Sequence, residues 1–206
     1  MRVILFLLSL AASQFCFAGG DTNIIAMSDW SKPVSTIYGH TLRARMIIAQ
    51  EHSPAHTGRW PETEFYLEIQ NVSSAIGSPT RFYFDPWHGL HCVMWDANGN
   101  ALPEGGGAGS GGGAGAGWIT LPYDCTIRLR ANMYGYGLKP GDGFLLTLCH
   151  GGDFGIRSGD TNAYYLSGTF NCSAPTNTIA GDFESERALW DGRLELPKMK
   201  IEVSKP

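Results

Sequence analysis

The chain has 206 residues, of which 17% are charged and 12% aromatic, and its formal net charge is −4 at pH 7. This length suits one domain with a sizeable hydrophobic core. The sequence has no block of basic residues, so composition gives no electrostatic basis for nucleic-acid binding.

The N-terminus has the three regions of a secretory signal peptide. Met1-Arg2 is a short positive region, and Val3–Ala12 is apolar. Small residues, Cys16 and Ala18, occupy the −3 and −1 places of a cleavage site. The apolar run is shorter than the roughly 20 residues that a transmembrane helix needs. We therefore expect residues 1–18 to be cleaved and the mature chain to be secreted or periplasmic, without a membrane span.

In an exported chain, the cysteine content predicts disulfides. The sequence has five cysteines, and cleavage would remove Cys16 and leave four. An even number in an exported chain predicts disulfides, and four cysteines allow three connectivities. Our hypothesis pairs Cys149 with Cys172, on neighbouring late strands, and secondarily Cys92 with Cys125. The alternative for Cys92 and Cys125 is a pair of packed thiols, because both are in phase with inward-facing apolar residues.

After the signal peptide, residues 19–37 lack hydrophobic periodicity and predict a loose arm with at most one short edge strand. Residues 38–206 then form a single domain. Its first two strands alternate between apolar and polar residues over Tyr38–Ala49 and Glu64–Val72, as half-buried strands do.

The remaining strand patterns follow at turn-bounded intervals. Asp96-Ala97-Asn98-Gly99 predicts a tight hairpin turn. Residues 104–117 are almost wholly glycine and alanine and predict a flexible loop. Such a run has too few side chains to bury, so burial cannot offset the entropy lost when its backbone is ordered. Pro197 indicates an edge strand or a bulge. We predict these later strands at Arg81–Phe84, Leu90–Trp95, Trp118–Leu121, Cys125–Ala131, Gly143–Cys149, Tyr164–Cys172 and Leu194–Val203.

These patterns predict an all-β fold, an immunoglobulin-like antiparallel β-sandwich of about eight or nine strands with a long Gly/Ala-rich loop. Leu67–Ser73 ends a strand in Asn-x-Ser, Val93–Gly99 carries Val-x-Trp-Asp-x-x-Gly, and two turn-then-strand units follow at Ile119–Leu129 and Leu138–Leu148. In this order the segment resembles secreted bacterial immunoglobulin-like domains, in particular the BsuPI-type proteinase-inhibitor domain, a β-sandwich. The resemblance covers residues 62–149 and supplies no inhibitory residue.

Residues that could ligate a metal do not form a recognisable motif. His88 and His91 are three apart in a strand context, so they point to opposite faces. His52 and His56 have Pro54 between them, which argues against a helix. Asp96-x-Asn98-x-Asn100 begins like a calcium loop, but the glycine and the final glutamate are absent. A calcium site within Asp153–Asn162 stays open as an alternative, and otherwise we expect no metal and no cofactor.

Aromatic residues are the best candidates for ligand binding. Trp60, Trp87, Tyr134 and Tyr136 fall in predicted loops, where their rings could stack on a sugar or grip a partner. The alternative is that they plug the ends of the sandwich. Two arginines in the motif Ile127-Arg128-Leu129-Arg130 are interpreted as a solvated strand face rather than an anion site.

We therefore expect an exported, non-catalytic binding or structural module whose partner is an unknown protein or carbohydrate. One alternative is a proteinase inhibitor that acts through an exposed loop. Another is a hydrolase, which the sequence disfavours because it has neither a Gly-x-Ser-x-Gly nor a His-Glu-x-x-His motif.

Overall fold

The computed structural model of this chain describes residues 22–51, 62–74, 79–103, 115–131, 143–148, 153–157, 163–172 and 188–202. These residues form twelve β-strands and no helix. No helix in this part of the chain is therefore long and apolar enough to cross a membrane. The expected signal peptide and residues 104–114 of the Gly/Ala loop lie outside the described residues.

The larger sheet is built around two long antiparallel strands, β3 (Thr41–Glu51) and β4 (Glu62–Asn71). Strand β1 (Thr22–Met27) pairs with the free side of β3, and β8 (Thr126–Arg130) pairs with the free side of β4, so the order is β1-β3-β4-β8. The short strand β2 (Val34–Ser35) also pairs with β3. Every pairing in this sheet is antiparallel, as the alternating patterns predicted.

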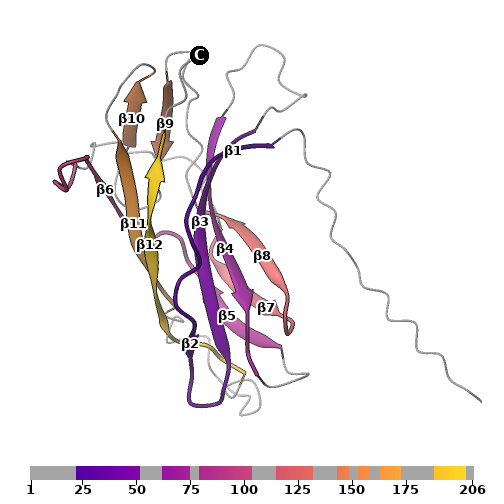
Figure 1. The fold of residues 1–206 in the computed structure, drawn as a ribbon. Coiled ribbons are helices and arrows are strands. Elements are labelled where there is room, and N and C mark those ends of the chain that lie inside the picture. The colour runs from indigo at the N-terminus through magenta and orange to yellow at the C-terminus, as the bar shows by residue number, and fades with distance from the viewer. Residues whose placement is uncertain are drawn as a thin grey trace, which may run out of the picture.

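The second sheet is antiparallel and has the order β12-β11-β6. Its strands are β6 (Leu90–Trp95), β11 (Tyr164–Asn171) and β12 (Arg193–Ile201). Two further strand pairs complete the described fold: β5 (Thr80–Phe84) with β7 (Gly117–Leu121), and β9 (Gly143–Thr147) with β10 (Asp153–Arg157). In Figure 1, the orange and yellow strands β11 and β12 stand to the left of the purple strands β3 and β4.

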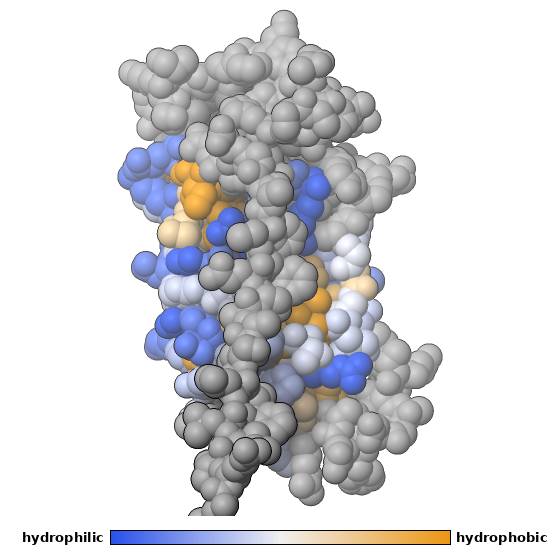
Figure 2. Space-filling view, turned by 90° about the vertical axis from the view of Figure 1, so that its right-hand side faces the viewer, coloured by the Kyte–Doolittle hydropathy of each residue, from blue (hydrophilic) through white to orange (hydrophobic). Residues whose placement is uncertain are grey.

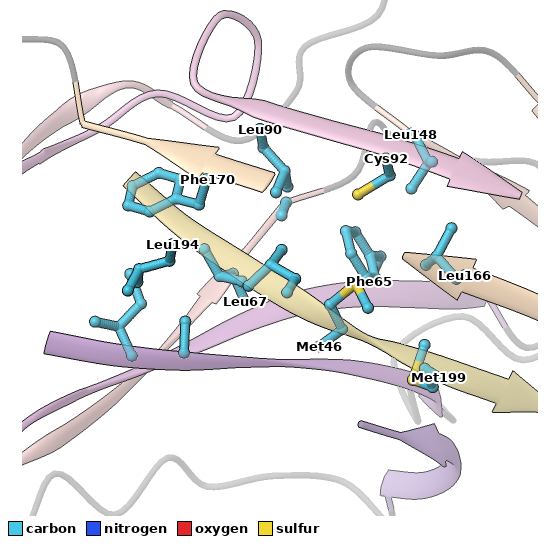
Figure 3. Close-up of a cluster of buried hydrophobic side chains, with 14 of the residues drawn as sticks. Met46, Phe65, Leu67, Leu90, Cys92, Leu148, Leu166, Phe170, Leu194 and Met199 are labelled. Atoms are coloured by element: carbon cyan, nitrogen blue, oxygen red, sulfur yellow. The ribbon is translucent and has the colours of Figure 1, made fainter. Parts of the chain in front are cut away.

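One hydrophobic core lies between the two sheets. Leu42, Ala44, Met46 and Ile48 of β3 and the apolar residues of β4 face one side of the larger sheet, and the inward residues of β6, β11 and β12 belong to the same cluster. Figure 3 shows side chains from both sheets pointing into this shared space. The buried residues that the two sheets contribute include Leu42, Met46, Phe65, Leu67, Leu90, Cys92, Leu166, Phe170, Leu194 and Met199.

The segment that we expected to be a loose arm is paired to the sheet over much of its length. After β1 ends, Ser28 and Ser31 continue the pairing with β3. The Ser28 amide donates to the Met46 carbonyl oxygen and the Met46 amide donates to Ser28 Oγ, both at 3.0 Å. Ser31 repeats the arrangement with Ala44. The serine hydroxyls thus take the place of the backbone carbonyl oxygens that would accept these hydrogen bonds in a regular strand. Because this pairing does not require alternating apolar residues, the sequence pattern did not predict it.

Two local predictions are confirmed. The Asp96–Asn100 segment is a tight turn with Gly99 at φ 82°, and it brings Trp95 and Ala101 into an antiparallel bridge. Pro197 lies in β12, an edge strand of its sheet, where the register with β11 shifts between Leu166 and Gly168. The described strands outnumber the eight or nine that we expected, because β1, β2 and β10 lie in segments predicted as arm or loop.

Candidate functional site

Of the four loop aromatics that we predicted to bind a ligand, the structure describes only Trp87. It lies in the turn between β5 and β6, half-buried, and its amide donates to Asp85 Oδ1 at 2.9 Å. Trp60, Tyr134 and Tyr136 lie outside the described residues. Whether the four rings form one surface therefore stays a prediction.

The structure contains no disulfide between the cysteines that it describes. Cys92 is buried in β6, whereas Cys125 is an exposed free thiol between the β7–β8 turn and β8, so the two are not joined. The expectation that Cys125 faces inward is wrong: it precedes β8, where the chain is still completing the turn. Cys172 is a buried free thiol, and its predicted partner Cys149 lies outside the described residues.

The histidines after β5 stabilise a turn and do not converge on a metal site. Asp85 accepts hydrogen bonds from the Trp87 and His88 amides and contacts His88 Nδ1 at 2.8 Å. Burial raises the pKa of the Asp85 carboxyl, but the hydrogen bonds from His88 and Trp87 outweigh it and leave the pKa below its usual value. His91 Nε2 lies 3.1 Å from the His88 carbonyl oxygen. No three potential ligands cluster within the described residues, while His52 and His56 lie outside them.

The Asp96 side chain stabilises the hairpin turn. Its carboxylate accepts hydrogen bonds from the Asn98 amide at 2.9 Å and from the Asn100 amide at 2.8 Å. The Asn100 side-chain amide donates to the second oxygen at 2.9 Å, and these bonds from Asn100 hold the pKa of Asp96 below its usual value. Of the Asp153–Asn162 segment, the structure describes only residues 153–157, which form β10.

A buried polar network links the start of β3, the end of β4 and the start of β5. His40 Nδ1 lies 3.0 Å from Thr80 Oγ1, and the Ser73 hydroxyl donates to Asn71 Oδ1 at 2.6 Å. Ser73 Oγ also accepts from the Thr41 amide at 2.8 Å. None of these side chains is more than 5% exposed apart from that of Thr41, which joins the network through its backbone amide. A substrate would have no access to the serine or histidine, so the network holds the fold together and does not resemble an active site.

The best exposed candidate site lies on the outward face of the second sheet. Tyr165 of β11 is the direct cross-strand neighbour of Trp95 of β6, and both rings are half-buried. The ammonium of Lys198, on β12, lies 4.5 Å from the centre of the Tyr165 ring and 5.7 Å from that of Trp95. We call Trp95, Tyr165 and Lys198 the aromatic platform.

Hydrogen bonding and neighbouring side chains fix the shape of this platform. The indole N–H of Trp95 donates to Ser167 Oγ at 2.8 Å, which sets the orientation of the ring. Val93, the cross-strand neighbour of Ser167, is 38% exposed and extends the apolar surface below the rings. The result is a partly exposed surface with two adjacent aromatic rings and a cation within reach, which suits binding by ring stacking and charge.

The outward orientation of both rings could be predicted from the sequence. In β6, the inward phase of Leu90, Cys92 and Met94 puts Trp95 on the outward face by alternation. The inward phase of Leu166 and Phe170 does the same for Tyr165. The cross-strand pairing of the two rings could not be predicted, because β6 and β11 are far apart in the chain.

Comparisons of the chain with protein-family models, with curated proteins and with solved structures find no significant match.

Proposed function

We propose that the mature chain is an exported, non-catalytic binding module with an immunoglobulin-like β-sandwich fold, and that its aromatic platform binds a carbohydrate. The N-terminal sequence pattern supports export. Two antiparallel sheets around one core support the sandwich. The buried Ser73 and His40, which no substrate can reach, support a non-catalytic role.

The observation that carries this proposal is the pairing of Trp95 with Tyr165 on the outward face of the sheet. Aromatic faces pack well against the apolar faces of sugar rings, and their amphipathic character suits partly wet interfaces. Lys198 adds a donor on a flexible four-carbon stem, which can turn from the rings to a sugar hydroxyl or carboxylate.

The test is to screen the purified protein on a glycan array and to titrate the strongest glycan against two variants. Trp95→Ala and Tyr165→Ala should each weaken binding about tenfold, because each removes a ring of the size that dominates binding energy at interfaces. Tyr123→Ala is the matched control. Tyr123 is 43% exposed in the β7–β8 turn, away from β6 and β11, so its loss should leave affinity unchanged. Equal binding by the platform variants and the wild type would refute the proposal.

A second candidate function is proteinase inhibition, and one observation favours it. The β2–β3 hairpin presents two adjacent apolar side chains at its tip: Ile37 is 92% exposed and Tyr38 is 55% exposed. The tip is held by backbone hydrogen bonds from the Thr36 amide to the His40 carbonyl oxygen, at 2.8 Å, and from the Gly39 amide to the Thr36 carbonyl oxygen, at 3.0 Å. A rigid tip with exposed apolar residues needs little ordering when it binds a partner.

Titration against a panel of serine, cysteine and metalloproteinases tests this second function. An inhibitor that acts through the tip should lose at least about tenfold in potency in Ile37→Asp, because the charge would have to be desolvated at the interface. Lys32→Asp, at another exposed position, is the control and should inhibit like the wild type. If no proteinase is inhibited at micromolar concentration, this second function is excluded.

A further inference from the structure

The outward face of the larger sheet gathers arginines from two strands. Alternation places Arg43 and Arg45 of β3 opposite the core residues of that strand, and Arg128 and Arg130 of β8 point to the same face. Strand β4 lies between β3 and β8 and contributes Glu68 and other polar residues. These arginines come from segments more than 80 residues apart, so the sheet order alone brings them together.

Glu68 lies at the centre of this group. Its Oε2 accepts a hydrogen bond from Arg45 Nε at 2.5 Å, and its Oε1 accepts one from Arg128 Nη2 at 3.1 Å. The side chain of Glu68 is only 9% exposed, whereas those of Arg45 and Arg128 are 24% and 38% exposed. The carboxylate is therefore more buried than the two guanidinium groups that flank it, and these groups are the more solvent-accessible part of the cluster.

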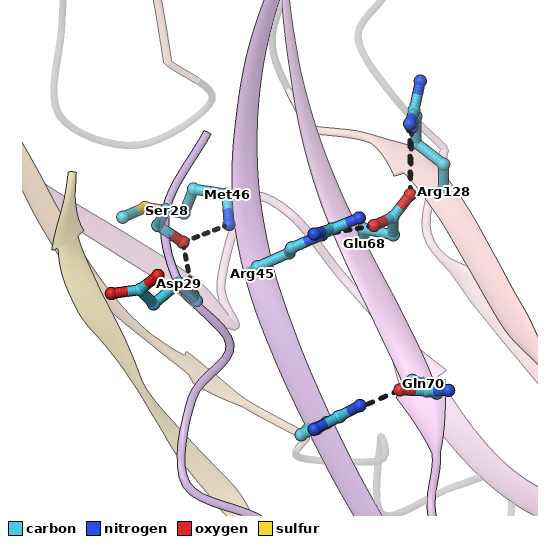
Figure 4. Close-up of polar contacts among 8 residues, drawn as sticks. Ser28, Asp29, Arg45, Met46, Glu68, Gln70 and Arg128 are labelled. Atoms are coloured by element: carbon cyan, nitrogen blue, oxygen red, sulfur yellow. Dashed lines mark hydrogen bonds and ion pairs between the residues drawn. The ribbon is translucent and has the colours of Figure 1, made fainter. Parts of the chain in front are cut away.

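Arg43 extends the group along β3. Its Nε donates to Gln70 Oε1 at 2.8 Å, which fixes the guanidinium without neutralising its charge. The guanidinium carbons of Arg43 and Arg45 lie 4.8 Å and 4.4 Å from the centre of the Trp30 ring, so the indole holds both side chains in place. Figure 4 shows Arg45, Glu68 and Arg128 in a row across the strands, with the carboxylate of Asp29 directed away from them.

The arrangement differs from an ordinary surface salt bridge in its charge balance. Arg43, Arg45 and Arg128 carry three positive charges and Glu68 one negative charge, so these four side chains together carry +2 in a chain whose net charge is −4. The neighbouring Arg130 pairs with Glu64 at 2.5 Å and adds no net charge. The three guanidinium groups are thus pre-positioned and only partly neutralised, which lowers the entropic cost of binding an anion.

We propose that this arginine ladder, which consists of Arg43, Arg45 and Arg128 around Glu68, binds the carboxylate or sulfate groups of an acidic polysaccharide. Guanidinium groups bind planar or tetrahedral oxyanions through two parallel N–H donors, and these are among the strongest hydrogen bonds in proteins. The ladder was not evident in the sequence, where Arg128 and Arg130 read as a solvated strand face.

The surroundings of the ladder favour an extended polysaccharide over other polyanions. The three arginines are spread along and across the strands of one sheet face and do not surround a single small ion. A local charge of +2 on an acidic protein is too small for the electrostatic binding of nucleic acid. The Tyr66 ring lies 5.9 Å from the guanidinium carbon of Arg128 and, with Trp30, gives aromatic surface beside the charges. This site does not depend on the aromatic platform, which lies on the other sheet.

The proposal is tested by titrating the purified protein with two acidic polysaccharides, heparin as the sulfated probe and polygalacturonate as the carboxylated probe. Neutral dextran and poly-glutamate serve as comparisons. Binding to at least one acidic polysaccharide should weaken about tenfold in Arg43→Gln and again in Arg128→Gln. Each of these substitutions should also reduce the slope of log affinity against log salt by about one. Preference for heparin or for polygalacturonate identifies the anionic group.

Two variants keep the test decisive. Arg193→Gln removes the same charge from an exposed arginine on β12, where it pairs with Glu195, and should bind like the wild type. Glu68→Gln keeps the shape of the side chain but removes the central negative charge, so affinity should rise at least about twofold. Circular dichroism confirms that each variant is folded. The proposal is overturned if the ladder variants bind like the wild type, if Arg193→Gln loses as much affinity, or if poly-glutamate binds as tightly as both polysaccharides.

Discussion

Cys172 shows how its surroundings set the chemistry of a single side chain. It is 4% exposed, and its Sγ accepts a hydrogen bond from the Tyr83 amide at 3.1 Å. Burial raises the pKa of this thiol to about 11, and the nearby charge of Asp191 acts in the same direction. Cys125, by contrast, is exposed, so the two thiols differ in their accessibility to solvent and reagents.

We predict that, at pH 8, a thiol reagent modifies Cys125 in the folded protein and modifies Cys172 only after unfolding. The thiolate is the reactive form, and its fraction at Cys172 stays small until the pH approaches about 11. Peptide mapping by mass spectrometry before and after addition of guanidinium chloride measures both sites, and Cys125→Ser is the control. A peptide pair joined through Cys149 and Cys172 under non-reducing conditions would contradict the free thiol.

At the scale of the element, β11 shows how closely its neighbours approach. Gly168 lies where the register between β11 and β12 shifts, opposite Cys92 of β6. A Cβ atom at this position would lie 2.5 Å from the His91 carbonyl oxygen and 2.9 Å from Cys92 Sγ. The first of these atoms belongs to a paired backbone, so it has little freedom to move. A glycine inside a strand commonly marks such a close approach.

We predict that Gly168→Ala destabilises the protein by about 2 kcal/mol, because the new methyl group overpacks the contact between β11 and β6. Gly117→Ala is the matched control within β7, where an added Cβ would have no atom within 4 Å. It should leave stability unchanged or slightly higher, since alanine has less freedom in the unfolded chain. Urea unfolding followed by circular dichroism measures both, and equal midpoints for the two variants would contradict the argument.

At the scale of the whole molecule, alternation predicted which residues face the core but not how the strands are ordered. The inward residues that alternate along β3, β4 and β6 were evident from a period of two. The partners of each strand were not, and the placement of β8 beside β4 gathers the arginine ladder. Figure 2 views the molecule from the right-hand side of Figure 1 and shows hydrophilic and hydrophobic residues side by side among the described residues.

The pairing of β4 with β8 forms the arginine ladder, and the pairing of β6 with β11 forms the aromatic platform. Both candidate binding surfaces therefore depend on the order of the strands in the sheets.

By itself, the sequence determined the all-β class, the antiparallel strands, the turn at residues 96–100 and the irregularity at Pro197. These depend on neighbours within a few residues, where alternation and turn chemistry act. The tertiary structure decided that residues 22–35 join the sheet, that Cys125 is exposed, and that Trp95 meets Tyr165. It also brought Arg45 and Arg128 to the two sides of Glu68. The reason is that strand pairing uses backbone hydrogen bonds, which every residue except proline can make, so side chains do not reveal which distant strands will pair.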